Sequence, residues 1–222
     1  MERDDVDHLD RLARRIDSPG PVALVDPLSR NLLSGPQGAG LGATAKWSLS
    51  GRDIILYGGD IGAHVPVTVS VENVPATAGA DLYWRHPVWP GYPVTTGMEL
   101  TWWAEGLRHS GAAIAEHRLE WITTTGAVLA TDSSPGIWPM ASYVPLFAAY
   151  VRPGVRFSHI GMWEMGASIL AMGDVAAELV SARVPPAGEG TPPYSITRYS
   201  HAPSPGNGAL RDIALELVEV TR

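Results

Sequence analysis

Glycine and proline interrupt this chain so often that long helices are excluded. The 222 residues include 24 Gly and 19 Pro. Gly weakens the interior of a helix, and Pro removes a hydrogen bond and clashes with the preceding turn. We therefore expect many short elements joined by turns. Because 45% of the residues are apolar, these elements can enclose a sizeable hydrophobic core.

Alternation of apolar and polar residues predicts that most of these elements are β-strands. Every second residue is apolar from Val65 to Val71 and again from Met98 to Trp102. A hairpin turn is expected at Thr125-Gly126. Further strands are expected over residues 112–124, 128–131, 145–151, 155–163, 167–172, 174–183, 194–200 and 213–220. Without βαβ alternation, this pattern predicts an all-β fold, a jelly-roll-like antiparallel β-sandwich.

A short amphipathic helix is expected before the strands, over residues 4–17. Its apolar residues recur at helical spacing: Val6, Leu9, Leu12, Ala13 and Ile16. This stripe needs a partner, which is either the chain's own domain or another subunit. The expected organisation is a helix and extended docking lead-in over 1–43, a β-sandwich over 44–184, and a linker with C-terminal docking strands over 185–222.

Charge and composition exclude several classes of function. The 16 Lys+Arg against 23 Asp+Glu give a formal net charge of −7, so nucleic-acid binding is not expected. The absence of Cys excludes disulfides and thiolate metal sites. No apolar run is long enough to span a membrane, and the acidic N-terminus lacks the apolar segment of a signal peptide. The seven His are scattered and nucleotide motifs are absent, so we expect neither metal nor cofactor.

The most distinctive local feature is the aromatic segment 82–93, which we expect to be a Pro-stiffened loop. Flat rings beside Arg and His donors suit sugar stacking or a protein interface. The alternative is that the rings cap the core. The candidate glycan or interface contacts are Tyr83, Trp84, Arg85, His86, Trp89 and Tyr92.

Other tryptophans and two carboxylates carry further expectations. Trp121, Trp138 and Trp163 are expected in the core. Trp102 and Trp103 point to opposite faces, so one is expected in the core and the other at least partly exposed. Glu116 and Glu120 share strand parity and could face one groove, as glycoside hydrolysis requires. Arg118 is expected on the opposite face.

Both ends of the chain resemble a known family. The segments that carry the resemblance are 21–33 (PVALVDPLSRNLL), 151–158 (VRPGVRFS), 174–179 (DVAAEL), 194–200 and 210–220. In this order they resemble the minor tail proteins of siphophages that infect actinobacteria. The resemblance implies a carbohydrate-binding-module-like β-sandwich after the lead-in. The segment 174–179 departs from the family's usual Gln-Leu-Glu ending, and the aromatic segment 82–93 matches nothing in it.

The resemblance implies a non-catalytic virion structural protein, a minor tail or tail-tip subunit that is made in the host cytoplasm. Other tail subunits, a trimer or hexamer of this chain, and a host cell-wall glycan are the expected partners. The alternatives are a carbohydrate-binding module without an assembly role, or a β-sandwich enzyme that cleaves glycans. Deleting residues 1–34 is expected to block assembly and leave the sandwich folded. The residues expected to dock on neighbouring subunits are Leu9, Leu12, Ile16, Asn31, Leu32, Leu33, Ile213, Leu215 and Leu217.

Overall fold

The computed structural model describes residues 3–16, 20–26, 30–50, 53–58, 65–74, 80–181, 187–205 and 207–220. Several sequence features lie outside these residues: the helix-stopping segment 17–19, Pro27-Leu28-Ser29 of the lead-in, His64 and the first linker residues to 186. The chain forms two compact units, unit 1 (Met1–Leu24 with Pro192–Arg222) and unit 2 (Val25–Thr191). The boundaries expected after residues 43 and 184 both fall inside unit 2.

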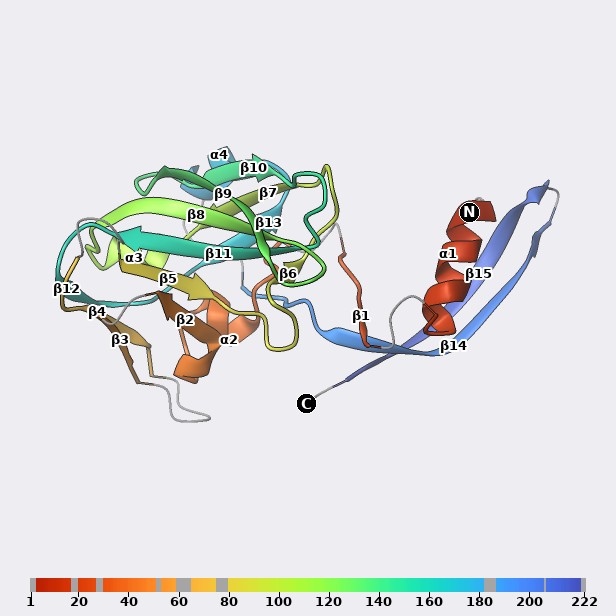
Figure 1. Ribbon diagram of the computed structural model, residues 1–222, viewed down its shortest axis with the longest axis horizontal. Helices are drawn as coiled ribbons and strands as arrows, with labels where there is room; N and C mark the ends of the chain where they lie inside the picture. Colours follow the sequence, from red (N-terminus) through yellow and green to blue (C-terminus); the bar gives the residue numbers. More distant parts are fainter. Residues whose placement is uncertain are drawn as a thin grey trace. The chain divides into compact units, whose positions relative to one another are not determined.

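Unit 1 is a helix packed on a long β-hairpin. Its elements are α1 (Arg3–Ala13), β1 (Val22–Ala23), β14 (Pro193–Ser204) and β15 (Asn207–Glu219). The strands β14 and β15 are antiparallel, and β1 pairs with the start of β14. The helix lies along the hairpin (Figure 1), where Tyr199 Oη donates to the Val6 carbonyl oxygen at 3.1 Å. Val6 of the predicted apolar stripe is therefore buried against its own chain, whereas Ile16 at the other end is 58% exposed.

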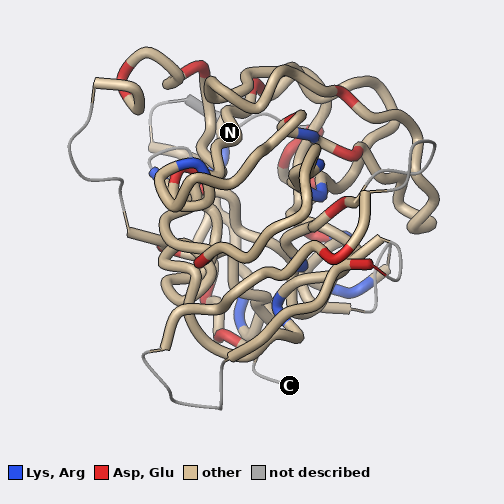
Figure 2. Tube along the Cα trace, turned by 90° about the vertical axis from the view of Figure 1, so that its left-hand side faces the viewer, with Lys and Arg blue, Asp and Glu red and all other residues tan. Residues whose placement is uncertain are grey.

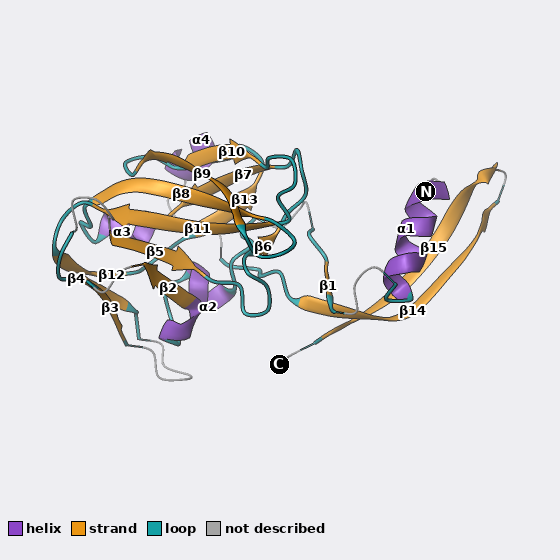
Figure 3. Ribbon diagram, in the orientation of Figure 1, coloured by secondary structure: helices purple, strands orange, loops and turns teal. Residues whose placement is uncertain are grey.

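The described strands of unit 2, drawn in orange in Figure 3, pair into three antiparallel sheets. The largest holds β2 (Trp47–Ser50), β5 (Ala80–Trp84), β11 (Tyr150–Phe157), β8 (Ile114–Ile122) and β9 (Val128–Pro135) in this order, and β6 (Tyr92–Pro93) also pairs with β11. The second holds β10 (Met140–Tyr143), β7 (Glu99–Trp103) and β13 (Ile169–Met172). The third holds β12 (Gly161–Glu164), β4 (Thr68–Val71) and β3 (Ile54–Tyr57). Short helices complete the unit: α2 (Gly35–Gly38), the 3₁₀ helix η1 (Thr44–Lys46), α3 (Glu105–His109) and α4 (Ala176–Ser181).

The core of unit 2 joins the six-stranded sheet to the two smaller sheets. Trp84 of β5 meets Trp102 of β7 edge to face, with 4.8 Å between ring centroids. Trp102 Nε1 donates to the carbonyl oxygen of Gly154 in β11 at 2.8 Å. These contacts tie the layers of a sandwich together. The expected all-β fold, with antiparallel sheets and a short N-terminal helix, is confirmed. No helix of the described residues is long and apolar enough to cross a membrane.

Two expectations about unit 2 were wrong for one common reason. A strand was expected over residues 174–183, but this segment forms the helix α4. Leu179 of α4 packs on Trp103, Ile169 and Ala171, so the outer side of the β7–β13 pair is covered. Trp102 and Trp103 are consequently both buried, although one of them was expected to be partly exposed.

Proline and tryptophan positions account for three further corrections. Two separate strands were expected over 145–151 and 155–163, but β11 (Tyr150–Phe157) runs through Pro153 and Gly154 without interruption. Trp121 is buried as expected, whereas Trp138 was expected in the core and is 56% exposed. Trp163 is half-buried and stacks on Phe157. Trp138 lies in the connection between β9 and β10, where strand alternation no longer decides which way a side chain points.

Candidate functional site

One face of the six-stranded sheet carries charged side chains. In β8, the two-residue period places Glu116, Arg118 and Glu120 on one face, and the residues between them point to the core. Arg152 of β11 lies opposite Glu120, and Arg156 lies opposite both Glu116 and Asp81 of β5. The term polar sheet face denotes Asp81, Tyr83, Glu116, Arg118, Glu120, Arg152 and Arg156.

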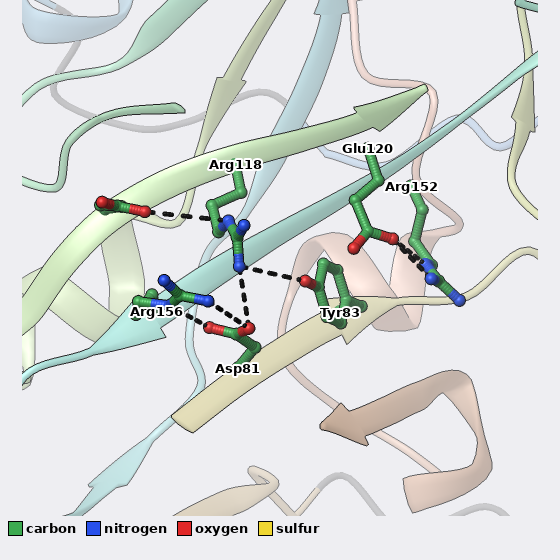
Figure 4. Close-up of polar contacts among 7 residues, drawn as sticks. Asp81, Tyr83, Arg118, Glu120, Arg152 and Arg156 are labelled. Atoms are coloured by element: carbon green, nitrogen blue, oxygen red, sulfur yellow. Dashed lines mark hydrogen bonds and ion pairs between the residues drawn. The ribbon is translucent and has the colours of Figure 1, made fainter. Parts of the chain in front are cut away.

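Asp81 holds two arginines from different strands (Figure 4). Arg156 forms a bidentate pair with it, from Nε to Oδ1 at 2.7 Å and from Nη2 to Oδ2 at 2.9 Å. Arg118 Nη1 donates to Asp81 Oδ2 at 2.8 Å. The hydrogen bond to Asp81 raises the pKa of Arg156, which stays charged. Because the Asp81 side chain is only 5% exposed, these pairs are screened less than surface ion pairs.

Tyr83 occupies the middle of the face. A Cβ on Gly154 would lie 2.4 Å from a ring carbon of Tyr83, so the ring lies directly against the backbone of β11. The guanidinium of Arg152 lies over this ring, 4.9 Å from its centroid, and its Nε donates to Glu120 at 2.9 Å. Burial, followed by a hydrogen bond to Glu120, raises the pKa of Tyr83, so the phenol keeps its proton.

The polar sheet face is balanced in charge, with three carboxylates and three guanidinium groups. Figure 2 marks the charged residues along the described trace, and in the whole chain acidic residues outnumber basic ones, 23 against 16. Arg118 Nε is buried without a hydrogen-bond partner, although Glu116 lies at ion-pair distance, 3.8 Å away. Guanidinium groups only donate hydrogen bonds and carboxylates only accept them. Within the face, these groups pair with one another: Arg118 and Arg156 donate to Asp81, and Arg152 donates to Glu120.

Only part of this site was predicted from the sequence. Glu116 and Glu120 do share a face, but Arg118 lies on it with them, so its expected opposite orientation was wrong. The two glutamates are four residues apart, about 13 Å along a strand. Each pairs with a different arginine, so the structure does not bring them together. The alternating charges of β8 signalled this face, whereas Asp81, Arg152 and Arg156 join it only through strand pairing.

The aromatic segment 82–93 is mostly part of the core. Tyr83 and Trp84 belong to β5 and Tyr92 belongs to β6, so the expectation of a continuous loop was wrong. Trp84 and Tyr92 are at most 1% exposed, and a ligand outside the fold cannot reach them. Their assignment as contact residues was therefore wrong, and the alternative in which rings cap the core describes them. Arg85 is exposed and Trp89 is half-buried, so contact through these two stays a prediction.

His86 fixes the turn between these strands. Its Nδ1 accepts hydrogen bonds from the backbone N–H groups of Val88 and Trp89, at 3.1 and 3.2 Å. The proton therefore belongs to Nε2, which donates to the Thr191 carbonyl oxygen at 2.9 Å. The ring stacks on Trp89, with 4.7 Å between centroids. Burial lowers the pKa of His86, so the neutral ring serves as a structural element.

The residues expected to dock on neighbouring subunits divide into two groups. Asn31, Leu32 and Leu33 are fully buried in unit 2, so their assignment to docking was wrong. The reason is that the lead-in is held inside the fold: Asn31 Nδ2 donates to the Ser168 carbonyl oxygen, and Asn31 Oδ1 accepts from Leu33 and Leu170 N–H groups. The other six residues all belong to unit 1, and their docking role stays a prediction. They are Leu9, Leu12, Ile16, Ile213, Leu215 and Leu217.

Comparisons with known proteins give one structural similarity. No protein-family model matches the chain, and no curated protein matches it. A search of solved structures finds the enzymatically active domain of tailspike protein 4 of bacteriophage CBA120, with a TM-score of 0.42 and 18% identity. The match covers 67% of this chain and 22% of that one, so it spans a small part of the tailspike chain.

This finding corrects one expectation. The protein was expected not to be an enzyme, and the similar solved structure is an enzymatically active domain. The expectation of a non-catalytic protein is contradicted and is not retained. Among the described residues, no group of three or more His, Asp or Glu is placed to hold a metal ion.

Proposed function

We propose that the protein is a glycan-recognition protein of a phage tail and that its polar sheet face contacts the glycan. The observation that carries this proposal is the charge-balanced array on one face of the six-stranded sheet, in which Glu116, Arg152 and Arg156 are the more exposed side chains, at 37%, 29% and 30%. The resemblance of the lead-in and the late strands to minor tail proteins supports a location in the virion. The narrower assignment, to siphophages of actinobacteria, is part of the same proposal.

The chemistry of the face suits neutral sugars. A sugar hydroxyl both donates and accepts hydrogen bonds, so it can bridge an arginine and the carboxylate next to it. Hydrogen bonds to charged groups are stronger than those between neutral groups. Since the three positive and three negative groups cancel, the face gives no net attraction to an acidic polymer. The ion pairs also hold these long side chains in place before a ligand arrives, which lowers the entropic cost of binding.

Exchanging one ion pair tests this proposal. The double variant Arg152→Glu/Glu120→Arg keeps a pair of opposite charges but reverses the donor and the acceptor and removes the cation from the Tyr83 ring. We expect an unchanged circular dichroism spectrum and at least about tenfold weaker binding to host cell-wall polysaccharide, the equivalent of one charge-assisted hydrogen bond. Arg108→Gln, an exposed arginine on α3, is the control. Equal binding by the wild-type chain and the double variant would reject the polar sheet face as the contact.

A separate observation favours a role for unit 1 in assembly. Among the described strands, β15 pairs only with β14, so one edge of a 13-residue strand has no partner. Such edges readily accept a strand from another chain. We propose that a second copy of this chain pairs there through a different edge of its own, the head-to-tail arrangement that closes into a trimer or hexamer. Leu9, Leu12, Ile16, Ile213, Leu215 and Leu217 remain the proposed docking residues.

Light scattering after size exclusion tests this assembly. We expect a stable trimer or hexamer for the full chain and a monomer for Leu215→Glu, because a charge beside the edge opposes strand addition. Leu129→Glu is a matched control, since Leu129 of β9 is as exposed as Leu215, at 41% each. A monomeric wild-type chain would reject self-assembly, and a Leu129→Glu variant that also dissociates would remove the edge of β15 as the cause.

A further inference from the structure

A cavity lies in unit 2, and none of its lining residues belongs to the polar sheet face. It has a volume of about 420 Å³ and is lined by Ser34, Gln37, Ala45, Lys46, Arg85, His86 and Pro87. Pockets of this size accept small organic molecules such as a monosaccharide. Lys46 directly precedes β2 and Arg85 directly follows β5, the strand paired with it. The Arg85 N–H donates to the Lys46 carbonyl oxygen at 2.9 Å.

A buried glutamine fixes the backbone of both cationic residues. Gln37 is 2% exposed, and its Nε2 donates to the carbonyl oxygens of Arg85 at 2.7 Å and Lys46 at 3.0 Å. Gln37 Oε1 accepts hydrogen bonds from Ser34 Oγ at 2.9 Å and Tyr92 Oη at 3.0 Å. Every polar atom of this amide is therefore used within the fold. The cavity is consequently built on a fixed frame.

The two cations of this cavity differ from the other described arginines of the sheet. Arg118, Arg152 and Arg156 each pair with a carboxylate. Within the part of the chain that the structure describes, neither Lys46 nor Arg85 has a carboxylate at ion-pair distance. His86, on the same wall, donates Nε2–H to Thr191. In a chain with a net charge of −7, two cations without acidic partners mark a local positive potential.

We propose that this cavity binds the anionic group of a sugar-sized ligand, a carboxylate or a phosphate, between Lys46 and Arg85. The guanidinium supplies paired donors and the ammonium supplies a compact charge, which together suit either oxyanion. Ala45 and Pro87 supply apolar wall for the remainder of the ligand. The site shares no residue with the polar sheet face, so it stands or fails independently of the proposed function.

Lys46 offers a direct measurement, because it is the one lysine in the sequence. We would label the full chain with an amine-reactive ester and follow modification of Lys46 by peptide mass spectrometry. The probes are glucuronate and glycerol phosphate, which separate a carboxylate from a phosphate source, and their neutral counterparts glucose and glycerol. We expect at least one anion to slow labelling in a saturable way that weakens with added salt. Neither neutral compound should slow it.

Variants separate a binding site from general charge effects. Lys46→Gln and Arg85→Gln should each weaken binding of the protecting anion about tenfold, measured by calorimetry, as expected for the loss of one charge-assisted contact. Arg108→Gln removes one exposed positive charge elsewhere and should leave binding unchanged. The proposal is overturned if neither anion protects Lys46, if the neutral compounds protect it equally, or if Arg108→Gln weakens binding as much as the cavity variants.

Discussion

At the scale of single residues, burial decides the charge state of the imidazole ring of His117. This residue is fully buried on the core face of β8. Its Nε2 accepts a hydrogen bond from the Ala104 N–H at 3.2 Å, and its ring lies edge-on to Trp102. Burial is the main cause that lowers the pKa of His117 to about 4. The ring is therefore neutral in the folded chain at neutral and mildly acidic pH.

This difference predicts a pH-dependent stability. In the unfolded chain His117 titrates near 6.5, so above that pH both states are neutral and the contribution to stability is fully present. As the pH falls from about 6.5 to 4, only the unfolded chain gains the proton, and the folded state loses about 3 kcal/mol. Urea unfolding of the wild type and His117→Gln at pH 7.5 and 4.5 should show a smaller loss in the variant. His109→Gln, which removes an exposed imidazole, should keep the wild-type loss. Equal losses in wild type and His117→Gln would contradict the assignment.

At the scale of elements, the helix α4 determines whether one side of a sheet is core or surface. Leu179 of this helix is 7% exposed and packs with Trp103 of β7. Without that cover, the Trp103 side of the β7–β13 pair would be a solvent-facing surface. This short helix thereby buries the second side of the β7–β13 pair. Trp102 and Trp103, which point to opposite sides, are both buried for that reason.

Truncating this contact should therefore destabilise unit 2. We expect Leu179→Ala to lower the free energy of unfolding by about 2–3 kcal/mol. The neighbouring side chains can only partly fill the space that the leucine leaves. The neighbouring Val180 is 46% exposed, and Val180→Ala should change stability by less than about 0.5 kcal/mol. Denaturant unfolding of both variants measures the difference. If the two substitutions cost the same, α4 does not cover the sheet as described.

At the scale of the whole molecule, the chain divides into two units, and each combines segments distant in sequence. In unit 2, the lead-in meets the last residues of the unit: the Glu189 and Gly190 N–H groups donate to the carbonyl oxygens of Asn31 and Leu33. The lead-in is thus part of the core and not a free arm. A deletion of residues 1–34, expected to spare the sandwich, would remove two leucines that are fully buried in it.

Truncation at two positions tests this organisation. We expect a fragment of residues 25–191 to unfold cooperatively, because it contains all of unit 2. A fragment of residues 35–191 should lose most of its stability. Removing Leu32 and Leu33 costs about 2–5 kcal/mol each, against a typical total of about 5–15 kcal/mol. Circular dichroism during urea unfolding measures both fragments. Equal midpoints for the two would show that the lead-in is dispensable.

The sequence by itself determined the local geometry of this protein. Dense Gly and Pro excluded long helices, and alternation identified the all-β class and placed Glu116 and Glu120 on one face of β8. These properties depend on backbone stereochemistry, which acts between neighbouring residues. The same alternation also specified that Trp102 and Trp103 point in opposite directions, which the fold preserves.

Only the tertiary structure decided which faces are buried and which charges meet. Asp81 joins arginines 37 and 75 residues away along the chain, and no local pattern encodes that pairing. Trp84 and Tyr92 became core because other layers pack on them, and Lys46 and Arg85 share a cavity because β2 pairs with β5. Burial and ion pairing depend on what distant segments bring to a surface, and that is settled only when the sheets assemble.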